Sequence, residues 1–275
     1  MLGKLIKHEF RATGRIMLPV MGALLILALL ANLSIRGLMG AVSDVAVLRF
    51  VFVLLVIFFV IAIIATAVMA LILMVSRFYQ NLLKDEGYLM FTLPVSEHSL
   101  IWSKLIVSSV WFLVTGVLIF LVLMLTVMNL SETNLHMLFE RMPTPEQIRA
   151  ALDRLGIRGQ LNTVVLQGVL LTILYTVSNC LHFYAAMALG HMFSKNKILL
   201  SIVFYVLISF VFNLIFMSLG GMMGMNMEST GLEEAKEVLG FVSSAMRQGI
   251  LIVTLQAAIL YIATALGLKR GLNLG

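Results

Sequence analysis

The chain has 275 residues, of which 61% are hydrophobic and 12% are charged, and its mean hydropathy is +1.07. A soluble domain has close to half apolar and a quarter charged residues, so this composition excludes an ordinary soluble domain. The net charge of +6 does not indicate nucleic-acid binding, because the basic residues are scattered at the ends of apolar runs and form no basic groove with interleaved aromatics. Basic flanks on the cytosolic side of membrane spans give the same total.

Several apolar runs exceed the roughly 18 residues needed to cross a hydrocarbon core of about 30 Å. Their residues do not alternate in polarity, so they predict helices rather than barrel strands. We predict an all-α integral membrane protein, with one transmembrane domain over residues 1–275 and six transmembrane helices. The predicted spans are approximately residues 16–35, 50–75, 105–130, 161–190, 199–221 and 248–268.

The first segment, residues 1–15, predicts an amphipathic elbow helix on the membrane surface. Its apolar residues share one helical face and its basic residues lie largely opposite: Leu2, Leu5, Ile6 and Phe10 against Lys4, Lys7, His8 and Arg11. This pattern is typical of a helix bound to the lipids of an anionic leaflet. A cleavable signal peptide is the alternative. Against it, the following apolar run is long for a signal peptide and no clear small-x-small cleavage site follows.

The distribution of basic residues predicts the orientation in the membrane. Four basic residues precede the first span, so we expect the N-terminus in the cytosol, and six crossings return the C-terminus to the same side. The connection over residues 131–160 is then extracellular. Its four arginines run against this orientation, because the rule weighs basic residues rather than net charge.

Two helices are predicted on the outer side. Thr144 and Gln147 have the spacing of a capping box, and Gly156 is a natural helix stop. A second outer helix is predicted over residues 232–239 and is expected to end at Gly240. These helices could be substrate gates, or they could simply seal the outer end of a helical bundle.

The loop between spans two and three, residues 76–104, is predicted to be cytosolic and to form a helix-turn-helix. Gly87 is placed to stop the incoming helix, Pro94 cannot continue a helix from before it, and Ser96 is a good N-cap for the next helix. We expect its apolar residues to lie against the membrane face and its charged residues, including Lys104, to remain in water. The candidate partner-docking residues are Asp85, Glu86, Gly87, Tyr88, Phe91, Pro94, Ser96 and Lys104.

The predicted spans hold almost no ionisable groups. Because acids and bases within a membrane usually mark proton or ion paths, this argues against a proton-driven transporter or an ion pump. Ser178, Asn179 and His182 lie close together in span four and are a candidate translocation path. The alternative is that they form interhelical hydrogen bonds in a packed bundle.

Familiar catalytic and cofactor-binding motifs are not found in the sequence. It has no Walker-type phosphate loop, no His-Glu-x-x-His pair and no Gly-x-Ser-x-Gly elbow. The five histidines lie in different segments, and Cys180 is the one cysteine. We therefore predict a chain that is not an enzyme and binds no cofactor or metal itself; a membrane enzyme would need a site made of scattered residues.

The elbow, the six spans and the loop after span two together resemble the membrane subunits of ATP-binding-cassette exporters of the type-two permease kind. The matching residues are Glu86-Gly87, Tyr88 to Leu93, Pro94, Ser96 and Lys104-Leu105, whereas the family's basic residue after the serine is replaced by Glu97-His98. The string DEGYLMFTLPVS is similar to permeases of Gram-positive bacteria.

The resemblance implies an exporter subunit in the cell membrane of a bacterium, driven by a separate ABC ATPase subunit that binds the loop at residues 76–104. ATP would then be bound by the partner. Six spans imply half of a channel, so a second permease subunit, identical or related, is expected. The competing interpretation is a membrane scaffold or sensor that does not transport and binds a partner through the same loop.

Overall fold

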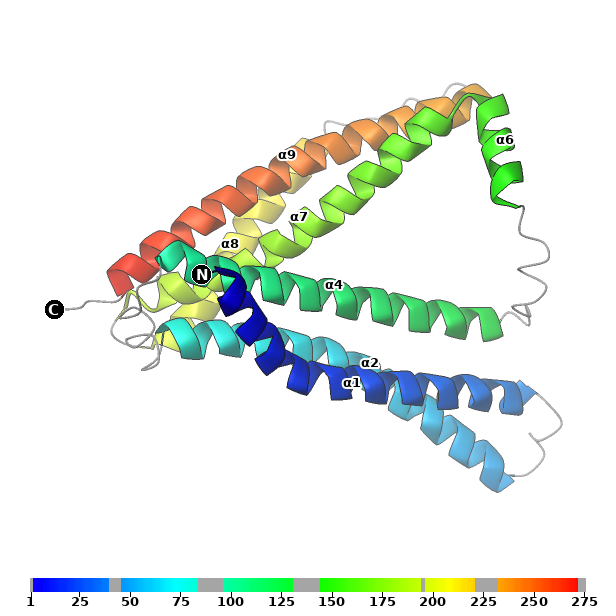
Figure 1. Ribbon diagram of the computed structural model, residues 1–275, viewed down its shortest axis with the longest axis horizontal. Helices are drawn as coiled ribbons and strands as arrows, with labels where there is room; N and C mark the ends of the chain where they lie inside the picture. The colour runs from blue at the N-terminus through cyan, green and yellow to red at the C-terminus, as the bar shows by residue number, and fades with distance from the viewer. Residues whose placement is uncertain are drawn as a thin grey trace. The chain divides into compact units, whose positions relative to one another are not determined.

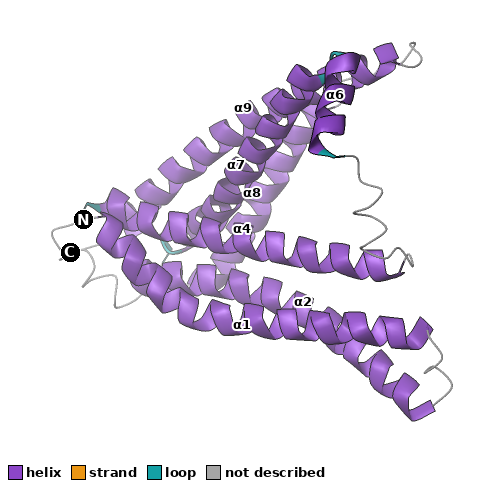
Figure 2. Ribbon diagram, turned by 45° about the vertical axis from the view of Figure 1, so that its right-hand side comes forward, coloured by secondary structure: helices purple, strands orange, loops and turns teal. Residues whose placement is uncertain are grey.

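The computed structural model describes residues 2–39, 46–83, 96–130, 144–193, 196–220 and 232–271. Every regular element in this part of the chain is helical, so the all-α class is confirmed (Figure 1 and Figure 2). The elements are α1 (Leu2–Met39), α2 (Ala46–Phe78), the π-helical turn η2 (Tyr79–Leu83), α4 (Glu97–Leu130), α6 (Pro145–Leu155), α7 (Arg158–Gly190), α8 (Lys197–Gly220) and α9 (Leu232–Gly271).

Six of the described helices are long and apolar enough to cross a membrane, which confirms the predicted number of spans. They are Leu2–Gly37, Ala46–Leu83, His98–Met128, Arg158–Gly190, Lys197–Met217 and Lys236–Lys269. Each overlaps a predicted span, and most are longer. The fourth has 33 residues, about 50 Å at 1.5 Å per residue. Because the hydrocarbon core is about 30 Å thick, such helices extend past it.

Helix α1 differs from the prediction because it is continuous. The separate elbow helix over residues 1–15 is therefore not confirmed. The ribbon of α1 bends in its N-terminal part (Figure 1). Pro19 gives a physical reason for a bend, because proline has no N–H and its ring clashes with the carbonyl four residues earlier. The amphipathic pattern itself is present: Lys4, Lys7 and Arg11 are exposed.

The predicted end of the second outer helix at Gly240 was wrong. Helix α9 runs without a break from Leu232 to Gly271 and passes through Gly240. Gly240 has ordinary right-handed helical geometry in this position rather than the left-handed conformation that closes a helix. The apolar residues that follow it continue the same helix into the last span. A glycine therefore stopped the helix at Gly156, where φ is +64°, but not here.

The chain divides into two compact units. The first contains Met1–Ser76 and Val110–Met142, and the second contains Arg77–Ser109 and Pro143–Gly275. Helices α2 and α4 therefore each contribute residues to both units. The loop that was predicted to dock a partner, residues 76–104, begins at the last residue of the Met1–Ser76 part of the first unit and ends in the second unit.

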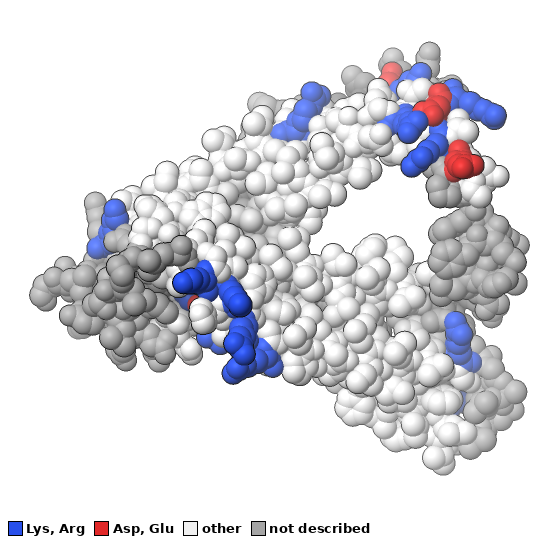
Figure 3. Space-filling view, in the orientation of Figure 1, with Lys and Arg blue, Asp and Glu red and all other residues white. Residues whose placement is uncertain are grey.

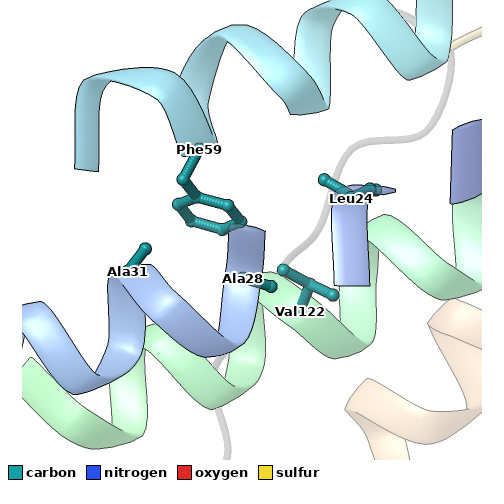
Figure 4. Close-up of a cluster of buried hydrophobic side chains, with 5 residues drawn as sticks. All are labelled: Leu24, Ala28, Ala31, Phe59 and Val122. Atoms are coloured by element: carbon teal, nitrogen blue, oxygen red, sulfur yellow. The ribbon is translucent and has the colours of Figure 1, made fainter. Parts of the chain in front are cut away.

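The first unit is held together by two apolar clusters. In one, Phe59 of α2 and Val122 of α4 pack against α1 residues Leu24, Ala28 and Ala31 (Figure 4). All five are at least 96% buried. The two alanines let the helices approach closely. Close van der Waals packing is important here because the hydrophobic effect does not drive helices together within lipid.

The second cluster of the first unit lies around Met17, Met21, Ala70 and Leu73, with Trp111 packed against it. Trp111 also donates a hydrogen bond from Nε1 to Thr13 Oγ1, at 2.8 Å. Polar contacts of this kind fix the register of helices that otherwise meet through apolar side chains.

In the second unit, α7 is the central helix. It packs along both α8 and α9, and it contacts the short helix α6. The capping box of α6 is formed as predicted: Gln147 N–H donates to Thr144 Oγ1 at 3.3 Å, and Thr144 N–H donates to Gln147 Oε1 at 2.9 Å. Gly156 ends α6 in the left-handed conformation.

Two glycines let the backbones of the second unit come close together. A Cβ added at Gly190 would lie 2.6 Å from the backbone nitrogen of Ser201 on α8. A Cβ added at Gly267 on α9 would lie 2.8 Å from Cβ of Ala188 on α7. These contacts join both neighbours of α7 to its C-terminal end.

Candidate functional site

The middle of the predicted docking loop, residues 84–95, lies outside the described residues. The positions of Asp85, Glu86, Gly87, Tyr88, Phe91 and Pro94 are therefore not given by the structure, and the helix-turn-helix is not confirmed. Both ends of the loop are described. We call the end of α2 with the turn η2, residues 77–83, the α2 flank. We call the start of α4, residues 96–109, the α4 flank; it includes the first five residues of predicted span three, 105–109.

The α2 flank is attached to α7 by aromatic rings. Phe78 is fully buried, and its ring stacks on that of Tyr184 with 4.0 Å between centroids and 10° between planes. Tyr79 meets the ring of His191 edge-on, with 5.2 Å between centroids. These residues lie where α2 widens into the π turn η2. Single π turns are rare in proteins overall, but those that occur are often found at functional sites.

The α4 flank begins at Ser96, in agreement with its predicted N-cap position. The Ser96 carbonyl accepts hydrogen bonds from the N–H groups of Ser99 and Leu100 at 2.9 and 3.3 Å. Its hydroxyl lies 2.8 Å from the Ser99 hydroxyl rather than on a backbone N–H. The helix therefore starts at Glu97, as predicted, although the side-chain cap is different from the usual one.

The α4 flank contacts α9 through an aromatic group. His98 Nδ1 is hydrogen-bonded to the hydroxyl of Tyr261, at 2.7 Å, and the two rings are stacked with 6.0 Å between centroids. Trp102, one turn further along α4, lies 5.7 Å from the same tyrosine ring. The residue pair Glu97-His98, at which the chain departs from the resembled family, therefore includes an attachment point to the last span.

One face of the α4 flank is buried against α7. Ser108 Oγ lies 2.9 Å from the hydroxyl of Tyr184, and Ser109 Oγ donates to Cys180 Sγ at 3.7 Å. Lys104 lies one turn before Ser108 on the same face and is 3% exposed. The prediction that Lys104 is left in water was wrong, because tertiary packing covers this face of α4.

Tyr184 thus contacts both flanks. Phe78 of the α2 flank stacks on its ring, and Ser108 of the α4 flank hydrogen-bonds its hydroxyl. Tyr184 itself is 0% exposed. A buried tyrosine requires a partner for its hydroxyl, and the serine provides one. The serine pair at residues 108–109 in an otherwise apolar helix is the sequence signal that could have indicated this contact.

His191, at the C-terminal end of α7, is buried and donates from Nδ1 to the carbonyl of Met187 at 2.8 Å. Burial lowers the pKa of His191 below its ordinary value, and nearby Lys197 acts in the same direction. The hydrogen bond to Met187 opposes the shift without cancelling it. The neutral imidazole is therefore the favoured form in the folded protein.

The candidate translocation residues are only partly brought together. Ser178 and His182 are buried on one face of α7, whereas Asn179 is exposed on another. His182 Nε2 lies 3.3 Å from Ser209 Oγ of α8, and His182 Nδ1 lies 3.4 Å from Gln256 Nε2 of α9. With a proton on Nε2, the histidine donates to the serine and accepts from the glutamine. His182 therefore makes interhelical hydrogen bonds, whereas the buried Ser178 hydroxyl has no hydrogen-bond partner among the described residues.

Charged side chains gather in two places. Lys and Arg lie over the N-terminal part of α1, and a group of mixed sign lies over α6 and the neighbouring helix ends (Figure 3). Within the second group Arg158 and Asp153 form an exposed ion pair at 2.8 Å. In the described part of the chain, no three His, Cys, Asp or Glu side chains are placed to hold a metal ion.

No family model, curated protein or solved structure matches the chain. The resemblance to exporter permeases therefore rests on the residues of the docking loop and on the six spans.

Proposed function

We propose that this chain is the transmembrane subunit of an ABC transporter, and that it works as an exporter driven by a separate ATPase subunit. The ATPase docks on the loop between the second and third spans, residues 76–104. Two such membrane subunits, identical or related, pack around the path of the substrate in a bacterial cell membrane, with both termini in the cytosol.

The observation that carries the proposal is the way in which the two flanks of the loop are held. A loop that is pushed by a partner moves the neighbouring helices only if its ends are attached to them. Here Phe78 and Ser108, one from each flank, contact the buried Tyr184 of α7, and the α4 flank also contacts Tyr261 of α9 through the exposed His98. An exposed connection between two spans needs no such attachment, because loops ordinarily run over the surface.

The composition of the spans also supports an external energy source. Among the candidate path residues, His182 is hydrogen-bonded to Ser209 and Gln256, and the described spans contain few charges. A proton-driven pump usually has buried acids or bases along its path. Work would therefore come from a partner that hydrolyses ATP.

The first test is co-purification. We expect the full-length chain, expressed with the other proteins of its host, to retain an ABC ATPase after solubilisation in mild detergent. Absence of any ATPase from a monodisperse preparation would remove the proposal. A scaffold or sensor would also bind an ATPase, but no compound would stimulate ATP hydrolysis as a transported substrate does.

The second test changes the loop. Glu86→Arg and Pro94→Ala should uncouple ATP hydrolysis from transport while the protein still folds. Glu146→Arg and Pro145→Ala on α6 are the matched controls, because they make the same chemical changes outside the loop. Coupling that is unchanged in the loop variants, or equally reduced in the controls, would contradict docking at residues 76–104.

A further inference from the structure

We propose that Tyr184 is the positioning residue through which movement of the docking loop reaches α7, α8 and α9. This inference rests on the proposed function, and it adds the identity of the contact that transmits the movement. Tyr184 contacts both flanks, through two different parts of its side chain.

The two contacts differ in kind and can be removed separately. The ring of Tyr184 stacks on Phe78 of the α2 flank at 4.0 Å. Its hydroxyl is 2.9 Å from Ser108 Oγ of the α4 flank. A phenylalanine at position 184 would keep the first contact and lose the second. A leucine at position 78 would lose the first and keep the second.

The α7 segment around Tyr184 is joined tightly to the other two helices. His182, two residues earlier, contacts Ser209 on α8 and Gln256 on α9. Four residues after Tyr184, Ala188 packs against the backbone of Gly267 on α9. Closely packed helices deform little and move between discrete arrangements instead. A displacement of α7 at Tyr184 should therefore also move α8 and α9.

The α4 flank has a second attachment, which limits what Tyr184 does alone. His98 and Trp102 hold the first turns of α4 to Tyr261 on α9. Loss of the Tyr184 hydroxyl should therefore loosen the flank around Ser108 more than around His98. The α2 flank has Tyr79 against His191 as its own second contact.

Hydrogen exchange measured by mass spectrometry tests the attachment without any partner. In the full-length chain in lipid nanodiscs, Tyr184→Phe should raise the exchange of amides in residues 103–109 about threefold to tenfold, as the loss of one buried hydrogen bond implies. Residues 77–83 should be unaffected. Phe78→Leu should raise the exchange of amides in residues 77–83 and leave residues 103–109 unaffected. Tyr175→Phe is the control, because Tyr175 lies on the same helix and is 60% exposed.

Two variants of Ser108 check that the hydrogen bond is responsible. Ser108→Ala should reproduce the exchange pattern of Tyr184→Phe, and adding both changes should have no further effect. Ser108→Thr keeps a hydroxyl and should restore most of the protection. Exchange in the α4 flank that does not respond to Tyr184→Phe, or responds equally to Tyr175→Phe, would overturn the inference.

The role in transmission is tested with the ATPase that co-purifies with the wild-type chain. Tyr184→Phe should leave the amount of bound ATPase and the KM for ATP unchanged, whereas kcat in the complex should fall at least threefold towards that of the isolated ATPase. A merely structural role would reduce complex formation as well. Equal kcat in wild type and variant would refute transmission through Tyr184.

The two proposals fail in distinguishable ways. If the wild-type chain binds no ABC ATPase, the proposed function and the transmission role are both wrong, and the exchange experiment still decides whether Tyr184 holds the flanks. If the ATPase binds and Tyr184→Phe changes neither exchange nor kcat, the proposed function stands and the inference about Tyr184 is wrong.

Discussion

Replacement of Gly190 by alanine should destabilise the protein, whereas the same replacement of Gly240 should not. Gly190 is the last residue of α7, and an added Cβ would lie 2.6 Å from the backbone nitrogen of Ser201. Ordinary van der Waals contact begins near 3.4 Å, so α8 would have to move by about 0.8 Å, the difference between 3.4 and 2.6 Å. Backbone atoms cannot rotate out of the way as a side chain can.

The magnitude follows from two opposing effects. Overpacking of this kind costs about 1–3 kcal/mol. Alanine is favoured over glycine inside a helix by up to about 1 kcal/mol, and by less at a helix end. An alanine Cβ at Gly240 would have no atom within 4 Å, so that variant receives the helix preference alone. The difference between the two variants, about 1–4 kcal/mol, is therefore the clash with α8 plus the part of the helix preference that is not gained at the end of α7.

Both variants can be compared by thermal unfolding in one detergent, with helical circular dichroism as the signal and gel filtration to confirm a single species before heating. We expect Gly190→Ala to melt several degrees below Gly240→Ala. A melting temperature for Gly190→Ala equal to or above that of Gly240→Ala would show that α7 and α8 do not approach as closely as described. Gly267→Ala, with Ala188 at 2.8 Å, provides an independent repeat.

Three further predictions concern single contacts. Because burial lowers the pKa of His191, the unfolded chain binds a proton at this residue more readily than the folded chain does. The contribution of His191 to stability should therefore be complete above about pH 6.5 and fall as the pH is lowered below that value. Melting temperature measured against pH should show this fall in the wild type and a smaller one in His191→Gln. Thr144→Ala should cost α6 about 1 kcal/mol and speed amide exchange in residues 146–149 without changing α7. Trp111→Phe keeps a smaller aromatic ring but loses the bond to Thr13, and should lower stability by at least about 1 kcal/mol; an unchanged melt would mean that the bond makes no net contribution.

Features that depend on neighbouring residues in the sequence could be predicted. The six spans follow from runs of apolar residues, and the capping box at Thr144 and the helix start after Ser96 follow from local spacing. The glycine rule worked at Gly156 and failed at Gly240, because a glycine ends a helix only where the chain beyond it turns away. At Gly240 an amphipathic segment leads directly into a span.

Features that depend on distant residues could not be predicted. Lys104 is a charged residue near a span end and was expected in water, but it is buried on the same helical face as Ser108, which contacts Tyr184 of α7. The contacts of Tyr184 and Tyr261 join segments separated by 76 and 163 residues, which no local pattern indicates. Asn179 follows Ser178 in sequence, yet one residue turns a helix by about 100° and places them on different faces.

The central claim is that residues 84–95 face the cytosol and touch an ATPase, and site-specific labelling tests it most directly. The native Cys180 is buried, so a Glu86→Cys variant offers one accessible thiol. In intact cells a membrane-impermeant maleimide should leave this thiol unlabelled until the membrane is opened, and a short thiol cross-linker should join it to the ATPase subunit. Labelling of the intact cells at position 86, or failure to cross-link any ATPase after the membrane is opened, would contradict the account.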